Sequence, residues 1–169
     1  MEDFIQVKRD NIIKIGIKDE NGNKTDKFLE FDLEDIELPL RYQELLEQHK
    51  KNLNYVKHQF IIIDKREDIK GNKFFSKNEE EKIKVVLEFY KREMAALDLL
   101  LGEGKTQMIL DVMKRKPYFE MFDDIAEALK PMSKVFEENA LRTTEVIKQK
   151  YGDINDEVLK WEIIQNILK

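Results

Sequence analysis

The sequence contains no cysteine and only two histidines, His49 and His58, among 169 residues. The lack of cysteine excludes disulfides, thiolate metal sites and thiol nucleophiles. Neither histidine has a second histidine or a glutamate four residues away, so no helical metal-binding pair is present. The G-x-S-x-G elbow of serine hydrolases is also missing. We therefore expect a protein that is not an enzyme, with no catalytic residues, no metal ion and no cofactor.

Basic residues are not in excess, because 30 lysines and arginines stand against 35 acidic residues. A net charge of −5 does not suit a surface that neutralises phosphates, so no nucleic-acid partner is expected. The longest apolar runs, residues 60–63 and 99–101, fall far short of the ~20 residues of a membrane span. The first four residues, Met-Glu-Asp-Phe, lack the basic start of a signal peptide. These features predict a soluble cytoplasmic protein that does not bind membranes.

The N-terminal part of the chain shows the alternation of β-strands. Ile13, Ile15 and Ile17 alternate with polar or small residues, and residues 29–33 repeat the pattern. The turn-forming cluster at 19–23 lies between them, which predicts an antiparallel hairpin. A preceding strand with Ile5 and Val7 on one face is a candidate third strand.

The rest of the chain has helical periodicity. Pro39 suits the first turn of a helix that runs to about residue 66, and its continuing pattern favours helix over strand at 60–63. Residues 67–76 predict a loop, and Ser76 with Glu79 predicts a capping box for a helix over 77–101 that ends at Gly102. The later helices are expected at 106–115, from 118 with a kink or restart at Pro131 to about 151, and at 155–169, which carries Trp161.

The predicted fold is therefore α+β and predominantly α-helical, with a small N-terminal antiparallel sheet of two or three strands packed on five or six helices. We expect one domain over residues 1–152, β-rich at 4–33 and helical at 39–152. Residues 153–169 are expected to form a helical appendage.

Gly104-Lys105-Thr106 resembles the end of a phosphate-binding P-loop. The glycine that begins such a loop is missing, since Leu99 stands at its position. A P-loop also follows a strand, whereas this segment follows a long predicted helix. The sequence therefore favours a corner between two helices, and we expect no nucleotide binding.

Methionines cluster in the second half of the chain, with four of them within 25 residues near two phenylalanines. Methionine is flexible and is frequent at adaptable binding surfaces, although it also fills cores. One hypothesis is an apolar groove that accepts a helix of another protein. The residues predicted to bind this client are Phe89, Tyr90, Met108, Met113, Phe119 and Phe122.

Three stretches of the sequence resemble the tail assembly chaperones of long-tailed phages and phage-derived tail-like particles. They are residues 31–42 (FDLEDIELPLRY), a long charged helix ending in Leu97-Asp98-Leu99-Leu100-Leu101, and the Gly102-Glu103-Gly104 corner with the short helix after it. An aromatic helix over 118–129 followed by Lys130-Pro131 is also similar. The likeness covers roughly residues 28–150. Many members carry a Phe-Gly pair soon after the short helix begins, where this chain has Leu110-Asp111.

The resemblance implies a non-catalytic chaperone that binds the tape measure protein, a long, largely helical chain with apolar stripes, and keeps it soluble in the host cytoplasm. Such proteins are absent from the mature particle. The tail tube protein is a second expected partner, and self-association is compatible with the resemblance. The alternatives are a structural tail component, such as a connector or completion protein, and a small helical regulatory or adaptor protein.

Overall fold

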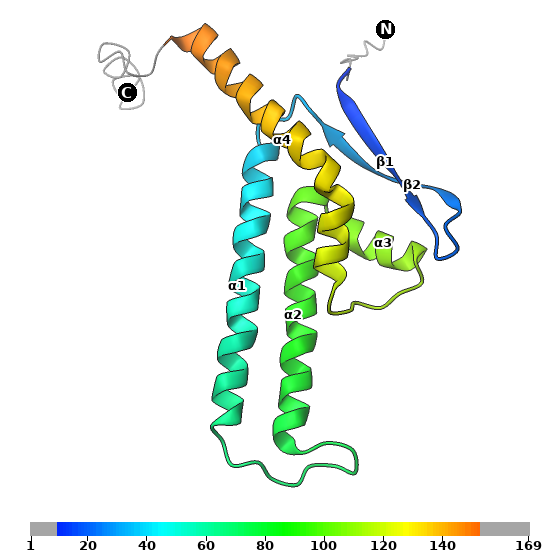
Figure 1. Ribbon diagram of the computed structural model, residues 1–169, viewed down its shortest axis with the longest axis vertical. Coiled ribbons are helices and arrows are strands. Elements are labelled where there is room, and N and C mark those ends of the chain that lie inside the picture. Colours follow the sequence, from blue (N-terminus) through cyan, green and yellow to red (C-terminus); the bar gives the residue numbers. More distant parts are fainter. Residues whose placement is uncertain (1–9, 153–169) are drawn as a thin grey trace, which may run out of the picture.

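The computed structural model describes residues 10–152. The candidate strand with Ile5 and Val7, and the final predicted helix at 155–169 with Trp161, lie outside the described residues. The elements follow one another as β1 (Ile12–Lys18), β2 (Lys24–Asp32), α1 (Leu38–Asp64), α2 (Lys77–Leu101), α3 (Lys105–Val112) and α4 (Met121–Tyr151). The α+β fold is confirmed (Figure 1).

The predicted hairpin is formed by β1 and β2, which pair antiparallel with Ile13 opposite Phe31 and Ile15 opposite Leu29. Side chains of opposite residues share a face, so both strands direct their apolar side chains toward the helices. The Asp19 carboxylate closes the turn by accepting hydrogen bonds from the backbone N–H groups of Asn21 and Asn23, each 2.9 Å long. These hydrogen bonds lower the pKa of Asp19 below its usual value, with that from Asn23 contributing most.

The two long helices α1 and α2 form an antiparallel pair that extends well beyond the rest of the molecule (Figure 1). Pro39 lies in the first turn of α1, and the helix continues through residues 60–63 as predicted. The capping box is present: Ser76 Oγ accepts from the Glu79 N–H, and the Glu79 carboxylate accepts from the Ser76 N–H. Gly102 ends α2 with φ of 103°, a backbone conformation that glycine adopts without strain.

The prediction of five or six helices is slightly off, because the described residues contain four and the predicted helix at 155–169 lies outside them. Of the two alternatives at Pro131, a kink and a new helix, the new helix is wrong, since Pro131 lies inside one helix of 31 residues. Figure 1 shows α4 changing direction in its middle, as expected where proline removes one backbone hydrogen bond. The start of α4 is Met121 and not residue 118. The end of α3 is Val112 and not residue 115, because the chain turns at Lys114, where φ is 50°.

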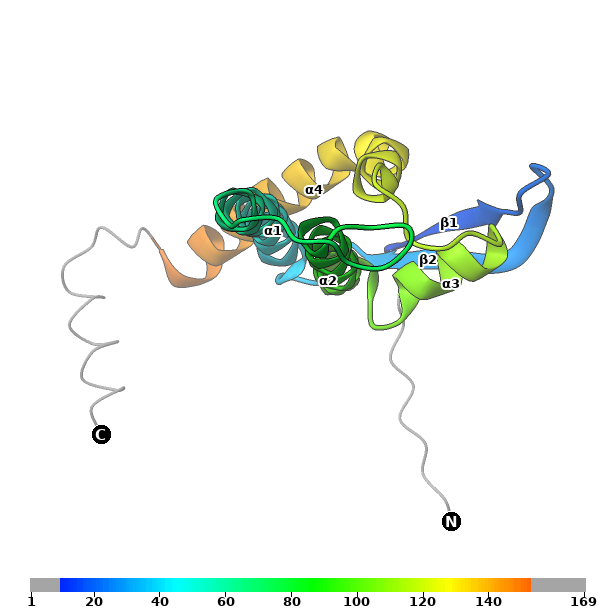
Figure 2. The same cartoon turned by 90° about the horizontal axis from the view of Figure 1, so that it is seen from below.

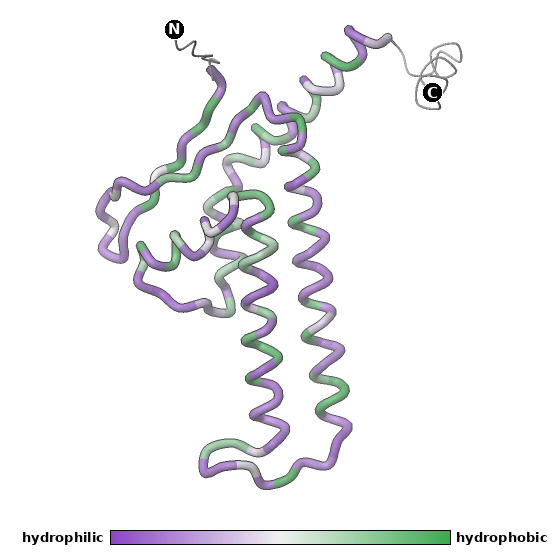
Figure 3. The backbone as a smooth tube through the Cα atoms, turned by 180° about the vertical axis from the view of Figure 1, so that it is seen from behind, coloured by the Kyte–Doolittle hydropathy of each residue, from purple (hydrophilic) through white to green (hydrophobic). Residues whose placement is uncertain are grey.

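The core lies where the upper part of the long helix pair meets the other elements. Figure 2, which looks along the two long helices, shows α4 on one side of the pair and the hairpin with α3 beside α2. Buried side chains from five elements build this cluster, and the isoleucines of β1 pack against it partly buried. Its members include Leu29, Phe31, Leu38, Leu45, Leu97, Leu110, Met121 and Phe136. Among residues 10–152, no other element packs on the lower part of the α1–α2 pair, although apolar residues recur along it (Figure 3).

A buried glutamate joins α2 to α1. Glu93 is 1% exposed, and its carboxylate accepts a hydrogen bond from the Asn52 side-chain amide at 2.6 Å. His49 Nδ1 lies 2.6 Å from the other carboxylate oxygen, and the His49 ring stacks on Phe122 of α4 with 3.6 Å between ring centroids. A buried carboxylate is tolerated only where its oxygens have partners. This contact therefore sets the register of α1 against α2 and joins α4 to both.

Glu93→Ala is expected to lower the free energy of unfolding by about 3 kcal/mol, because Asn52 and His49 lose their shared partner in the protein interior. The matched control is Glu88→Ala on the exposed side of α2, where the glutamate pairs with Arg92 at 3.1 Å. That change is expected to cost less than about 0.5 kcal/mol. Urea unfolding followed by circular dichroism measures both values, and equal losses for the two variants would contradict this role of Glu93.

Candidate functional site

Three of the six residues predicted to bind a client meet in one place. The rings of Phe89, Tyr90 and Phe119 form a triangle, with centroids 6.1 Å apart for Phe89–Tyr90, 6.4 Å for Phe89–Phe119 and 6.1 Å for Tyr90–Phe119. Phe89 is buried at the base, Tyr90 is half-buried and Phe119 is 61% exposed. Phe119 belongs to the segment that leads into α4, so this aromatic triangle connects that segment to α2.

The other three predicted residues lie elsewhere. Phe122 is buried against His49 and belongs to the core. Met108 is partly buried against the same core, and Met113 lines a separate cavity beside β1. The structure therefore does not bring the six residues together into one surface, since the methionines serve packing around α3.

A continuous apolar surface extends from the aromatic triangle down the uncovered part of α2. We call it the hairpin face, after the helical hairpin of α1 and α2 and not the β hairpin of β1 and β2. It consists of Phe60, Ile83, Val86, Leu87, Tyr90 and Phe119. Its lower part surrounds an open groove of about 350 Å³, lined almost entirely by apolar side chains. Leu87, Phe119 and Ile83 are all exposed, so the surface faces solvent.

Helical spacing explains why these residues share a face. Ile83, Val86, Leu87 and Tyr90 stand at i, i+3, i+4 and i+7, which places them on one side of α2. Other residues that α2 buries, such as Val85, Phe89 and Ala96, stand on the neighbouring side. The side of the stripe is itself buried further up the helix, at Leu97 and Leu101, and only its lower part has no neighbour among the described elements.

Ile83, Val86, Leu87 and Phe60 are the members of this surface that the sequence-based prediction missed. The pattern contained a signal for them, because the apolar stripe of α2 is wider than a single packing contact requires. The sequence alone did not show which side of the stripe the rest of the protein would cover.

Charged groups border the hairpin face. Lys82 Nζ lies 2.5 Å from an Asp64 carboxylate oxygen and 5.4 Å from the centroid of the Phe60 ring. Desolvation raises the pKa of the Tyr90 hydroxyl, and the nearby negative charge of Glu120 adds to this. An apolar centre with a charged border is the usual composition of a protein-binding surface.

The corner at Gly104-Lys105-Thr106 is closed to phosphate by the protein itself. The Asp98 carboxylate accepts hydrogen bonds from the N–H of Gly104 at 2.8 Å, the N–H of Thr106 at 2.9 Å and the Thr106 hydroxyl at 2.7 Å. These groups lie at the start of α3, where a helix favours an anion. Thr106 is fully buried, so a bound phosphate would have to displace Asp98.

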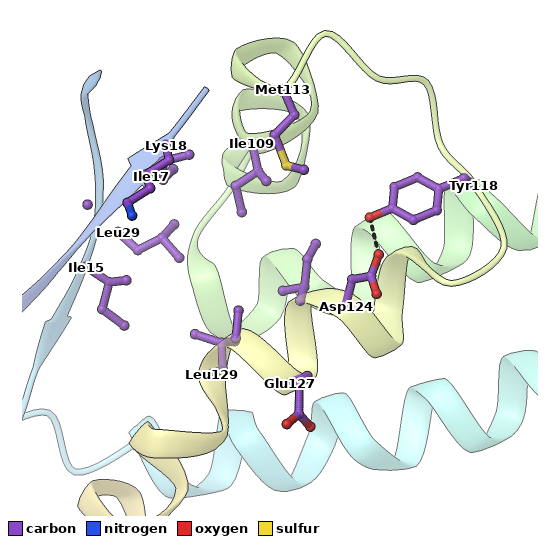
Figure 4. Close-up of a pocket in the computed structure, with 13 residues that line it drawn as sticks. Ile15, Ile17, Lys18, Leu29, Ile109, Met113, Tyr118, Asp124, Glu127 and Leu129 are labelled. Carbon is purple, nitrogen blue, oxygen red and sulfur yellow. Dashed lines mark hydrogen bonds between the residues drawn. The ribbon is translucent and has the colours of Figure 1, made fainter. Parts of the chain in front are cut away.

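A second apolar space lies between the β hairpin, α3 and the start of α4 (Figure 4). Its volume is about 490 Å³, and aliphatic side chains including Ile15, Ile17, Leu29, Ile109 and Leu129 line it. Tyr118 donates a hydrogen bond to Asp124 at 2.8 Å on its border. Burial raises the pKa of Tyr118 most, and the hydrogen bond to Asp124 raises this pKa further. The lining is mainly apolar, and Lys18, Tyr118, Asp124 and Glu127 are its polar members.

Comparisons with known proteins found no matching family model, no matching curated protein and no matching solved structure. Within residues 10–152, no helix is both long enough and apolar enough to cross a bilayer. The same residues contain no cluster of three or more histidine or acidic side chains arranged to hold a metal ion. The hairpin face and the sequence motifs are therefore the features of the chain that bear on its function.

Magnesium ATP and GTP are expected to leave the melting temperature unchanged, because the Asp98 carboxylate occupies the donors that a phosphate would need. Differential scanning fluorimetry with inorganic phosphate as a further ligand tests this. A saturable rise in melting temperature with nucleotide concentration would contradict it, since any ligand that binds the folded state stabilises it.

Proposed function

We propose that the protein is a non-catalytic chaperone that binds an apolar helix of another protein on the hairpin face. The observation that carries the proposal is the exposed stripe of Ile83, Val86, Leu87 and Tyr90, extended by Phe119. Exposed apolar surface of this continuity is unusual on a protein that acts alone, and it commonly marks a binding site.

A helix is the partner that suits this surface. The groove runs between Phe60 of α1 and the apolar stripe of α2, so a third helix would bury side chains spaced by three and four residues against both. The start of α4 already packs against the upper part of the same helix pair, through Phe122 on His49 and Phe119 on Tyr90. A client helix on the hairpin face would continue this packing below α4.

The charge distribution supports solubilisation of such a client. Charged residues make up 38% of the chain, and the surface of the α1–α2 pair beyond the hairpin face is rich in them. A complex would cover the apolar stripe of the client and expose this charged surface instead, which opposes aggregation. The hairpin face is small and open, which favours weak and reversible binding.

The resemblance in residues 28–150 narrows the proposal to a phage tail assembly chaperone, with the tape measure protein as client. That protein is long, largely helical and apolar along its stripes, which is the chemistry that the hairpin face can accommodate. The chaperone would bind its client in the host cytoplasm and would be absent from the finished particle. A structural tail component remains the alternative that the same resemblance allows.

Co-expression with the tape measure protein of the same gene cluster is expected to make that protein soluble, and the two are expected to co-elute in size exclusion. Apolar helical fragments of the tape measure protein serve as smaller clients. If the long protein stays insoluble while this chain elutes alone, the client assignment is wrong. Detection of this chain by mass spectrometry in finished particles would favour the structural tail component.

Leu87→Asp and Phe119→Ser are expected to reduce the yield of soluble client at least tenfold, because each places a polar group in the apolar contact. Loss of one buried apolar side chain costs about 1.5–3 kcal/mol of binding free energy, which corresponds to roughly a tenfold change or more. Leu40→Asp is the matched control, since Leu40 is 65% exposed and lies at the far end of α1. The site assignment fails if Leu87→Asp and Leu40→Asp retain equal yields.

A further inference from the structure

The two strands of the hairpin are covered unequally. Leu29 and Phe31 of β2 are buried, at 4% and 2% exposure, whereas Ile13, Ile15 and Ile17 on the same face of β1 are only partly buried. Among residues 10–152, β2 is the only strand that pairs with β1. The apolar face of the sheet is therefore incomplete along the outer edge of β1.

The backbone of β1 offers hydrogen-bonding groups along this edge. The Leu33 N–H donates to the Asn11 carbonyl at 2.8 Å, which fixes the phase of the ladder. In an antiparallel ladder the groups alternate in direction, so the N–H and C=O of Ile12, Lys14 and Gly16 point away from β2. An edge of this kind is a template for another strand.

The apolar space shown in Figure 4 adjoins the same edge. Its lining follows β1 from Ile15 through Gly16 and Ile17 to Lys18, opposite α3 and α4. A strand placed beside β1 would therefore direct its inward side chains toward this space. The occupant must supply apolar residues at alternate positions and must tolerate the two lysines on the opposite face of β1.

We propose that the occupant is β1 of a second copy of this chain, paired antiparallel about a two-fold axis with Ile15 opposite Ile15. Outward-pointing backbone groups must meet each other. Of the registers that allow this, three overlap most of β1, and their central pairs are Lys14 with Lys14, Lys14 with Gly16, or Gly16 with Gly16. The first opposes two lysines directly. The third opposes Lys14 with Lys18, and like charges in opposite positions are unfavourable.

The register with Lys14 opposite Gly16 avoids both repulsions. It is centred on Ile15, places Ile13 opposite Ile17 of the second copy, and overlaps the whole of β1 from Ile12 to Lys18. All three isoleucines of each copy then share one apolar face, where the mouth of each apolar space is covered by the other copy. The result is a four-stranded antiparallel sheet with a closed, isologous interface. This dimer is independent of client binding, because it forms through β1, whereas the hairpin face lies on α1, α2 and the segment before α4.

Single cysteines test the register, since the chain has no cysteine of its own. In the proposed dimer Ile15 faces Ile15 in a non-hydrogen-bonded pair, where Cα atoms lie about 4.5 Å apart, within the range of a disulfide. Ile15→Cys is therefore expected to form a disulfide-linked dimer under mild oxidation. Ile13→Cys alone is expected to stay monomeric on a non-reducing gel, because the two copies of residue 13 lie about 13 Å apart, at ~3.3 Å per residue.

A mixture of two cysteine variants tests the same register by a link that should form. Chains with Ile13→Cys, mixed with chains with Ile17→Cys, are expected to link as a heterodimer. If Ile13→Cys alone links as readily as Ile15→Cys, or if Ile15→Cys remains unlinked, the proposed register is wrong.

Lys14→Pro tests the interface without breaking the hairpin, because the Lys14 N–H points away from β2 and proline removes only that outward donor. In analytical ultracentrifugation at high concentration, the wild type and Lys14→Ala are expected to approach twice the 20.2 kDa of one chain. Lys14→Pro is expected to stay at one chain mass with an unchanged circular dichroism spectrum. A wild type that stays monomeric would overturn the proposal. If the Lys14 N–H of that monomer also exchanged slowly with solvent, the edge of β1 would be covered by another part of the same chain.

Discussion

The contact of the buried Glu93 carboxylate with His49 and Asn52 is the constraint on which the rest of the structure depends. A carboxylate inside the protein must have its oxygens satisfied, so α1 and α2 can pair only in the register that brings these three residues together. Phe122 stacks on His49, which attaches α4 to the same point. One polar contact thus joins three helices at a single point, beside the apolar cluster that buries the same side of α2.

The candidate site is a consequence of that order. With Val85, Phe89 and Glu93 directed into the interior, the stripe from Ile83 to Tyr90 is left on the neighbouring side of α2. The same side is covered only further up the helix, at Leu97 and Leu101. The α4 segment reaches down only as far as Phe119, which contacts Phe89 and Tyr90. Below that level the α1–α2 pair presents apolar surface with only two helices among the described residues, and this is the place that we propose for a helix of another protein.

Local patterns in the sequence were sufficient for most of the architecture. The alternating isoleucines predicted β1, Ser76 and Glu79 predicted the start of α2, and Gly102 predicted its end, because each acts through neighbouring backbone groups. The number of helices was not predictable in the same way, since the effect of Pro131 depends on the packing of α4. Packing of its flanking residues, including Leu129, Met132 and Phe136, keeps one bent helix in place of two.

The candidate site was only half predictable for a related reason. Phe89, Tyr90 and Phe119 were recognised as apolar and aromatic, but exposure is a property of the assembled fold. Met108 and Met113 have the composition of a binding surface, yet α3 directs them to the core and to the space beside β1. The role of Asp98 was likewise invisible in the sequence, because it bonds to residues six and eight positions further along the chain.

Binding of a client helix on the hairpin face can be measured by the alkylation rate of a single cysteine introduced at Leu87, in the free protein and in the purified complex with an apolar helical client. We expect the client to slow alkylation strongly at residue 87 and to leave a cysteine at Leu40 as reactive as in the free protein. An unchanged rate at residue 87 in an otherwise intact complex would show that the client binds elsewhere and that the hairpin face is not its site.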